Sequence, residues 1–319
     1  MTIRYTMNPR IFNINEAQYR KLFLNEKLHY DYSALSPLLR SIRGKLCQKI
    51  NEKIKLMQNN NVEKYKFNTT IRPDVNKYCD NIIFSITIQK MEGNIQNVVA
   101  QYVNDKGELD TFTKKLIEPQ IKVFINVNTE YEYNKLYLLS HLSHELTHLI
   151  DDYEELQRGN PSLSYNTMNG TIETLRNLTG ENIIIQTLFN IVYTGYKFEE
   201  KAFIIQSYHE FEKVGCTPLN YKAKYKETLP YQNYMRMFDK TVKTLQTVSN
   251  EELEDTNYLF NTVYKDKNIP KLPINNFNPN AYRQKLIGLA EKIKHDFLKK
   301  YGGVLTAYID DYKRVNNII

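Results

Sequence analysis

The sequence predicts a mostly helical α+β protein in which a small antiparallel sheet lies next to a central helix. Long segments have apolar residues at the three- and four-residue spacing of helices. One region, residues 81–127, is instead rich in β-branched and aromatic residues. Directly after it, a helical segment holds half of the histidines of the chain. With 319 residues, 41% of them apolar, the chain has ample material for a core.

Two helices are expected before the sheet, over residues 15–28 and 33–58. A polar run, Asn59 to Asn61, ends the second pattern. In that helix, apolar residues recur at helical spacing at Leu38, Leu39, Ile42, Leu46, Ile50 and Ile54.

Three strands follow, over residues 81–90, 97–103 and 120–127. The segment Asn104–Gly107 after the second strand is typical of a hairpin turn. The strands are therefore expected to pair in an antiparallel sheet.

After residue 134 the pattern is almost entirely helical, and proline-containing segments separate the expected helices. We expect three regions: an N-terminal helical region (1–75), a core with the sheet and the histidine-rich helix (76–215), and a C-terminal helical region (216–319). The expected helices span residues 134–156, 171–192, 197–213, 229–248, 250–264 and 280–300.

Composition argues against several classes of function. The formal net charge of +7 is spread over the chain without a long basic block, so nucleic-acid binding is not favoured. No apolar run approaches the roughly 20 residues of a membrane-spanning helix, and the N-terminus lacks the apolar segment of a secretory signal. The three cysteines show no CxxC spacing, which argues against a thiolate zinc site. We therefore expect a cytoplasmic protein with no membrane partner.

The histidine-rich helix carries the motif His144-Glu145-Leu146-Thr147-His148. Residues four apart lie on one face of a helix, so His144 and His148 can bind the same metal ion. Glu145 is adjacent and can take a proton from a metal-bound water, whose pKa zinc lowers to about 7. The motif therefore predicts a site for one Zn²⁺ ion.

A catalytic zinc ion needs a third protein ligand. Glu199 is preferred because it lies on a second expected helix, where the small Ala202 would allow close packing against the first. Glu200 is its direct competitor. Asp151 and Asp152 lie on the helix of the two histidines and would reach along it, so we expect them to hydrogen-bond the imidazoles instead.

Short motifs within residues 120–210 resemble the gluzincin metallopeptidases, which bind zinc through two histidines and a glutamate. HELTH followed by Asp152-Tyr153 is similar to the active-site helix of thermolysin-like enzymes. The run Asp151-Asp152-Tyr153 is also similar to the anthrax lethal factor type. The ExxA pattern at Glu199–Ala202 resembles the third-ligand helix of several small gluzincins.

The resemblance implies a zincin-like fold for the 76–215 core, and an extended peptide or protein substrate paired with the strand at Ile121–Val127. Phe203 departs from the thermolysin-like pattern, because those enzymes have an aspartate at this position. The separation of about fifty residues between the motif and the third ligand is also longer. The site residues that the resemblance implies are the zinc ligands His144, His148 and Glu199, and the general base and acid Glu145.

Enzymes of this group commonly stabilise the transition state with a tyrosine or histidine beside the metal. The candidates are Tyr193, Tyr196, Tyr208 and His209, of which we name Tyr196 and His209 as catalytic candidates. His141, one turn before the motif, is expected to be a flanking polar residue.

The motif predicts a zinc-dependent endopeptidase in which Glu145 acts as general base on a metal-activated water. The alternative is a non-catalytic zincin-like structural or assembly protein that retains the metal, such as a component packaged in a phage particle. The flanking helical regions, which contain no catalytic motif, would suit that role. The intact Glu145 favours the enzyme.

Overall fold

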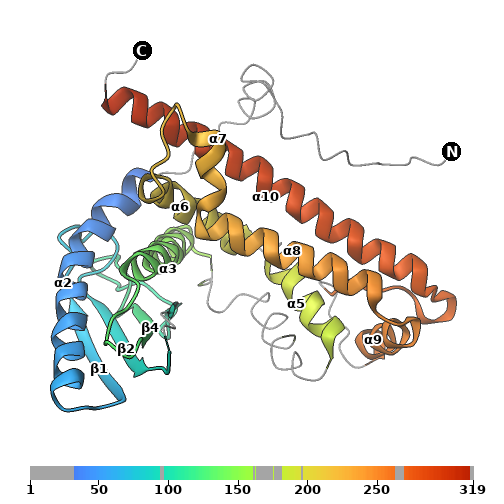
Figure 1. The fold of residues 1–319 in the computed structure, drawn as a ribbon, viewed down its shortest axis with the longest axis horizontal. Helices are drawn as coiled ribbons and strands as arrows, with labels where there is room; N and C mark the ends of the chain where they lie inside the picture. Colours follow the sequence, from blue (N-terminus) through green and yellow to red (C-terminus); the bar gives the residue numbers. More distant parts are fainter. Residues whose placement is uncertain are drawn as a thin grey trace.

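The computed structural model contains a four-stranded sheet packed with two helices, and a set of further helices beside it (Figure 1). The structure describes residues 32–93, 97–160, 162, 175, 182–194, 197–262 and 269–316. The helix expected at 15–28, and most of residues 171–182 of another expected helix, lie outside the described residues.

The sheet contains β1 (Lys64–Ile71), β2 (Ile82–Lys90), β3 (Asn97–Val103) and β4 (Gln120–Val127), in the order β1-β2-β4-β3. The pairs β1–β2 and β3–β4 are antiparallel, but β2 and β4 run parallel. The expectation of an antiparallel sheet is therefore wrong, and the sheet is mixed. The cause is that β3 pairs with β4 from the outside instead of lying between β2 and β4.

Strand β1 was not expected from the sequence, although its tyrosine, phenylalanine and isoleucine alternate with polar residues in KYKFNTTI. The strand order places β1 at an edge of the sheet, and four of its eight residues are exposed. Polar side chains on an exposed edge discourage pairing with other chains.

Helices α2 (Tyr32–Asn59) and α3 (Lys135–Gln157) pack against the sheet, α2 beside β1 and α3 beside β3. Along β2 and β4, every second residue is buried and the residues between are more exposed. This alternation is expected when helices cover one face of a sheet. The buried residues of the sheet join those of α2 and α3 in one apolar core.

The second half of the chain is helical, as expected, with boundaries close to the predicted ones for several elements. Its elements are α5 (Ile183–Thr194), α6 (Lys197–Lys213), α7 (Tyr221–Lys224), the 3-10 turn η3 (Tyr225–Glu227), α8 (Leu229–Thr247), α9 (Asn250–Thr262), the 3-10 turn η4 (Ile274–Asn276) and α10 (Pro279–Val315).

Helix α10 continues well past residue 300, where the expected helix ended before Gly302-Gly303. The glycine pair lies inside the helix because the residues after it are needed in the core: Val304, Leu305 and Tyr308 are buried. Figure 1 shows α10 running along the length of the molecule, with α8 beside it.

Helix α6 joins the two halves, because it packs against α3 on one side and against α10 and α8 on the other. Residues of α6 contribute to the core of the sheet and to a separate aromatic core with α8 and α10. In the described part of the chain, none of the helices combines the length and apolar character that crossing a membrane requires.

We predict that Phe297→Ala lowers the free energy of unfolding by about 3–5 kcal/mol, because it leaves a cavity in the aromatic core. Phe297 is fully buried, and its ring stacks on that of Tyr234 with centroids 3.9 Å apart. Phe112→Ala is the matched control, since Phe112 is 94% exposed and its loss should change stability by less than about 0.5 kcal/mol. Urea unfolding followed by circular dichroism measures both, and equal effects would contradict the proposed core position.

Candidate metal centre

Helix α3 begins at a side-chain cap: Asn134 Oδ1 accepts hydrogen bonds from the backbone N–H groups of Leu136 and Tyr137, at 3.0 and 3.1 Å. Asparagine is among the preferred residues at this position because it satisfies N–H groups that have no partner within the helix. From this start, His144 and His148 fall one turn apart on the face turned toward α6.

The first turn of α6 positions three consecutive charged residues toward three different partners. Glu199 approaches the two histidines, Glu200 forms an ion pair with Lys300 of α10, and Lys201 forms an ion pair with Asp151 of α3. Successive residues on a helix point about 100° apart, so one helix can serve all three partners. The structure therefore brings Glu199, and not Glu200, to the histidine pair.

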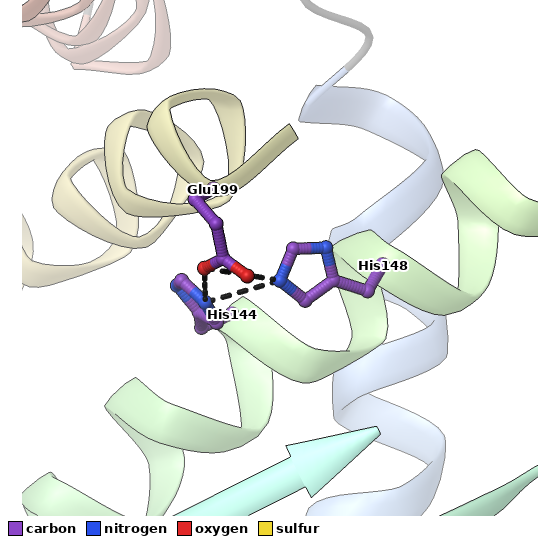
Figure 2. A group of neighbouring side chains, drawn as sticks. All are labelled: His144, His148 and Glu199. Carbon is purple, nitrogen blue, oxygen red and sulfur yellow. Dashed lines mark hydrogen bonds and ion pairs between the residues drawn. The ribbon is translucent and has the colours of Figure 1, made fainter. Parts of the chain in front are cut away.

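Three ligand atoms converge on one point (Figure 2). His144 Nε2 lies 3.2 Å from His148 Nε2 and 3.2 Å from Glu199 Oε2, and His148 Nε2 lies 3.6 Å from the same oxygen. In a tetrahedral zinc site with bonds of about 2.0–2.1 Å, two ligand atoms lie roughly 3.3–3.4 Å apart. The observed triangle is close to one face of such a tetrahedron, so the group could hold a metal ion.

The group is largely buried but not closed. The side chains of His144, His148 and Glu199 are 6%, 14% and 16% exposed, respectively. Two imidazole nitrogens and one carboxylate oxygen leave a tetrahedral metal with one position for water or a substrate, which is the pattern of catalytic sites.

The charged side chains of the group shift each other's pKa values. Burial alone would raise the pKa of Glu199, but His148 and His144 outweigh it and hold that pKa well below its usual range. Burial alone would lower the pKa of His148, but Glu199, followed by Glu145 and Asp151, raises it to about 9. Without a metal, a proton on His148 balances the buried carboxylate. A bound cation would take the place of that proton.

Glu145 is buried beside the group, on the side of strand β3. The backbone N–H of Tyr102 in β3 donates to Glu145 Oε2 at 2.6 Å. Burial raises the pKa of Glu145, while His144 and His148 oppose this shift. The carboxyl group of Glu145 is therefore held between the histidine pair and the edge strand β3.

Asp151 and Asp152 are bound to other groups than the imidazoles, contrary to expectation. Asp151 pairs with Lys201 of α6. Asp152 accepts hydrogen bonds from Tyr102 Oη at 2.8 Å and Asn104 Nδ2 at 2.5 Å. It thereby ties β3 and the segment after it to α3. Both carboxylates position the elements that carry the site.

His144 is oriented by packing. The ring of Phe203 lies against its imidazole, with centroids 4.4 Å apart. Nδ1 of His144 is buried and has no hydrogen-bond partner among the described residues. Phe203, which departs from the thermolysin-like pattern, therefore supports this ligand by contact and not by a hydrogen bond.

Of the four residues expected to stabilise a transition state, three are described by the structure, and only Tyr193 among these three lies at the group. Tyr193 lies at the group, because its hydroxyl donates to Glu199 Oε2 at 2.7 Å. Tyr196 lies outside the described residues. Tyr208 donates to Asp311 of α10 at 2.5 Å.

His209 does not reach the group, since at 1.5 Å per residue it lies roughly 15 Å along α6 from Glu199. Its pKa is lowered to about 4 by burial and by Lys213. The pKa of His141, one turn before the motif, is also lowered to about 4 by burial and by His144. Neither histidine contributes an atom to the triangle of ligands.

Tyr102 was not expected at the site. It supplies both its backbone N–H and its hydroxyl to carboxylates of α3. Its place next to α3 depends on the strand order, and no pattern within NVVAQYV marks it.

Comparison with known protein families, with curated proteins and with solved structures found no match to this chain. The assignment of the site therefore rests on its geometry and chemistry.

We predict that Glu199→Ala strongly reduces the zinc bound by the purified protein, because it removes one of three protein ligands. Glu200→Ala is the matched control on the same helix turn, and it should keep the zinc content of the wild type, since Glu200 faces Lys300. Atomic absorption measures the metal, and circular dichroism checks that both variants fold. Undiminished zinc in Glu199→Ala, or loss only in Glu200→Ala, would contradict this ligand set.

Proposed function

We propose that the protein is a zinc-dependent peptide hydrolase. The observation that carries the proposal is the combination of the triangle of His144, His148 and Glu199 with the buried carboxylate of Glu145 beside it. Two histidines, one glutamate and an open fourth position are the donor set of several zinc hydrolases.

Glu145 and Tyr102 have different roles in the proposed reaction. When bound, zinc would lower the pKa of a water molecule to about 7 and polarise the carbonyl of a peptide. Glu145 accepts a proton from the attacking water and delivers it to the leaving amine. Its raised pKa makes it a better proton acceptor than an exposed glutamate. The Tyr102 N–H fixes one of its two oxygens, which leaves the other for proton transfer.

Strand β3 is the part of the sheet that suits an extended substrate. The expectation placed the substrate on Ile121–Val127, but this strand, β4, is paired on both sides, with β2 and with β3. Strand β3 is an edge strand, and the N–H of Tyr102 points away from β4 toward Glu145. Residues two apart in a strand point the same way, so Ala100 and Val98 present their backbone groups on this side too. A peptide paired there would lie along the site without demands on its sequence.

A protein that only retained the metal would have no use for Glu145. Burying a carboxylate is costly unless it is paired, and Glu145 is buried beside the candidate ligands His144 and His148, with a hydrogen bond from the backbone N–H of Tyr102. This argues for the hydrolase over the non-catalytic assembly protein, although both would bind the metal.

We predict that Glu145→Gln keeps the zinc content of the wild type but lowers peptide cleavage by about 10²–10⁴-fold, because the amide cannot accept a proton. Glu154→Gln is the matched control: Glu154 lies on the same helix, is 44% exposed and pairs with Arg158, so activity should be retained. Cleavage of denatured casein and of a mixed peptide library, read by mass spectrometry, measures the activity.

Two outcomes would overturn the hydrolase. The first is wild-type cleavage by Glu145→Gln. The second is a wild type that binds one zinc ion but cleaves no peptide of the library, which would support the assembly protein.

A further inference from the structure

Three contacts converge on one oxygen of Glu199. Oε2 lies 3.2 Å from His144 Nε2 and 3.6 Å from His148 Nε2, and it accepts a hydrogen bond of 2.7 Å from the hydroxyl of Tyr193. The oxygen of Glu199 that lies near both imidazole nitrogens is therefore also the one that accepts the hydrogen bond of the phenol.

Tyr193 lies on α5, the helix that directly precedes α6, six residues before Glu199. It lies near the end of α5, whose buried residues pack with α8, α9 and α10 in a core of their own. Its ring stacks on that of Phe189, one turn earlier, with centroids 5.5 Å apart and planes 17° from parallel. This stacking sets the plane of the ring and so the direction of the hydroxyl.

The hydroxyl acts as a hydrogen-bond donor to the carboxylate. Its hydrogen bond to Glu199 Oε2 is 2.7 Å long, and an ionised carboxylate can only accept.

We propose that Tyr193 is a positioning residue for the metal ligand Glu199. A carboxylate oxygen has two lone pairs, and the phenol occupies one, which leaves the other for a metal ion bound by the two imidazoles, whose Nε2 atoms lie 3.2 and 3.6 Å from this oxygen. A glutamate side chain that is free to rotate must be ordered when metal binds, whereas one already held by a partner is pre-organised. This inference rests on the metal centre of the proposed function.

Tyr234 provides a matched comparison. It is another tyrosine near the site, 1% exposed, and its ring contacts Phe203 with centroids 4.9 Å apart. Its hydroxyl, however, has no hydrogen-bond partner in the described part of the chain. Replacement by phenylalanine thus removes one hydroxyl at each position, but only at Tyr193 does it remove a hydrogen bond to a candidate ligand.

The test is zinc affinity, measured by chelator competition on the full chain for the wild type, Tyr193→Phe and Tyr234→Phe. We expect Tyr193→Phe to weaken zinc binding about 10–100-fold, the usual effect of losing a partner of a metal ligand, and Tyr234→Phe to match the wild type. Saturating zinc should restore the kcat of Tyr193→Phe, because a positioning residue acts through the metal.

The outcomes separate this inference from the metal centre itself. Equal zinc affinity of Tyr193→Phe and the wild type would overturn the role of Tyr193 alone. An equal loss in Tyr193→Phe and Tyr234→Phe would also overturn it, since that result would reflect packing. A low kcat at saturating zinc would show that the phenol takes part in the reaction instead. A wild type without zinc would overturn the metal centre, and this inference with it.

Discussion

Helix α6 packs against α3 along the line where Glu199 faces His144 and His148, and the rest of the site takes its position from this contact. The two helices belong to different halves of the molecule, since α3 covers the sheet and α6 leads to the aromatic core with α8 and α10. A metal bound by both helices would join the two halves.

Polar side chains also join α3 and α6 at this contact, and they would be costly to bury without partners. The Lys201–Asp151 ion pair lies close to the ligands, and further along the helices Ser140 of α3 hydrogen-bonds to Glu210 of α6. Glu210 also accepts a hydrogen bond of 2.6 Å from the first backbone N–H of α8. These bonds favour one register of α6 on α3, because a shift by one residue would leave each carboxylate without its partner.

Acidic residues of α3 bind neighbouring elements on two sides of the helix. Glu145 and Asp152 bind the edge strand β3 through Tyr102, and Asp151 binds α6. The helix is thus the element that connects the candidate ligands with the edge strand β3. The stacking of Tyr193 on Phe189 adds a third element, α5, to the surroundings of the same carboxylate.

The sequence by itself determined the local parts. Helical spacing was enough for α3, and for α6 with the residues of its first turn, because the periodicity of a helix depends only on near neighbours. The pairing of His144 with His148 follows from the same periodicity. Tertiary structure alone decided the strand order, and with it that β3 and not β4 lies at the edge next to Glu145. It also decided between Glu199 and Glu200, which are adjacent and chemically alike, because Lys300 lies about a hundred residues further along the chain. Contacts between distant segments have no spacing in the sequence by which they could be recognised, so Tyr102 and Lys300 had to be found in the folded chain. Tyr193 was one of four candidates in the sequence, and the tertiary structure decided that its hydroxyl binds Glu199.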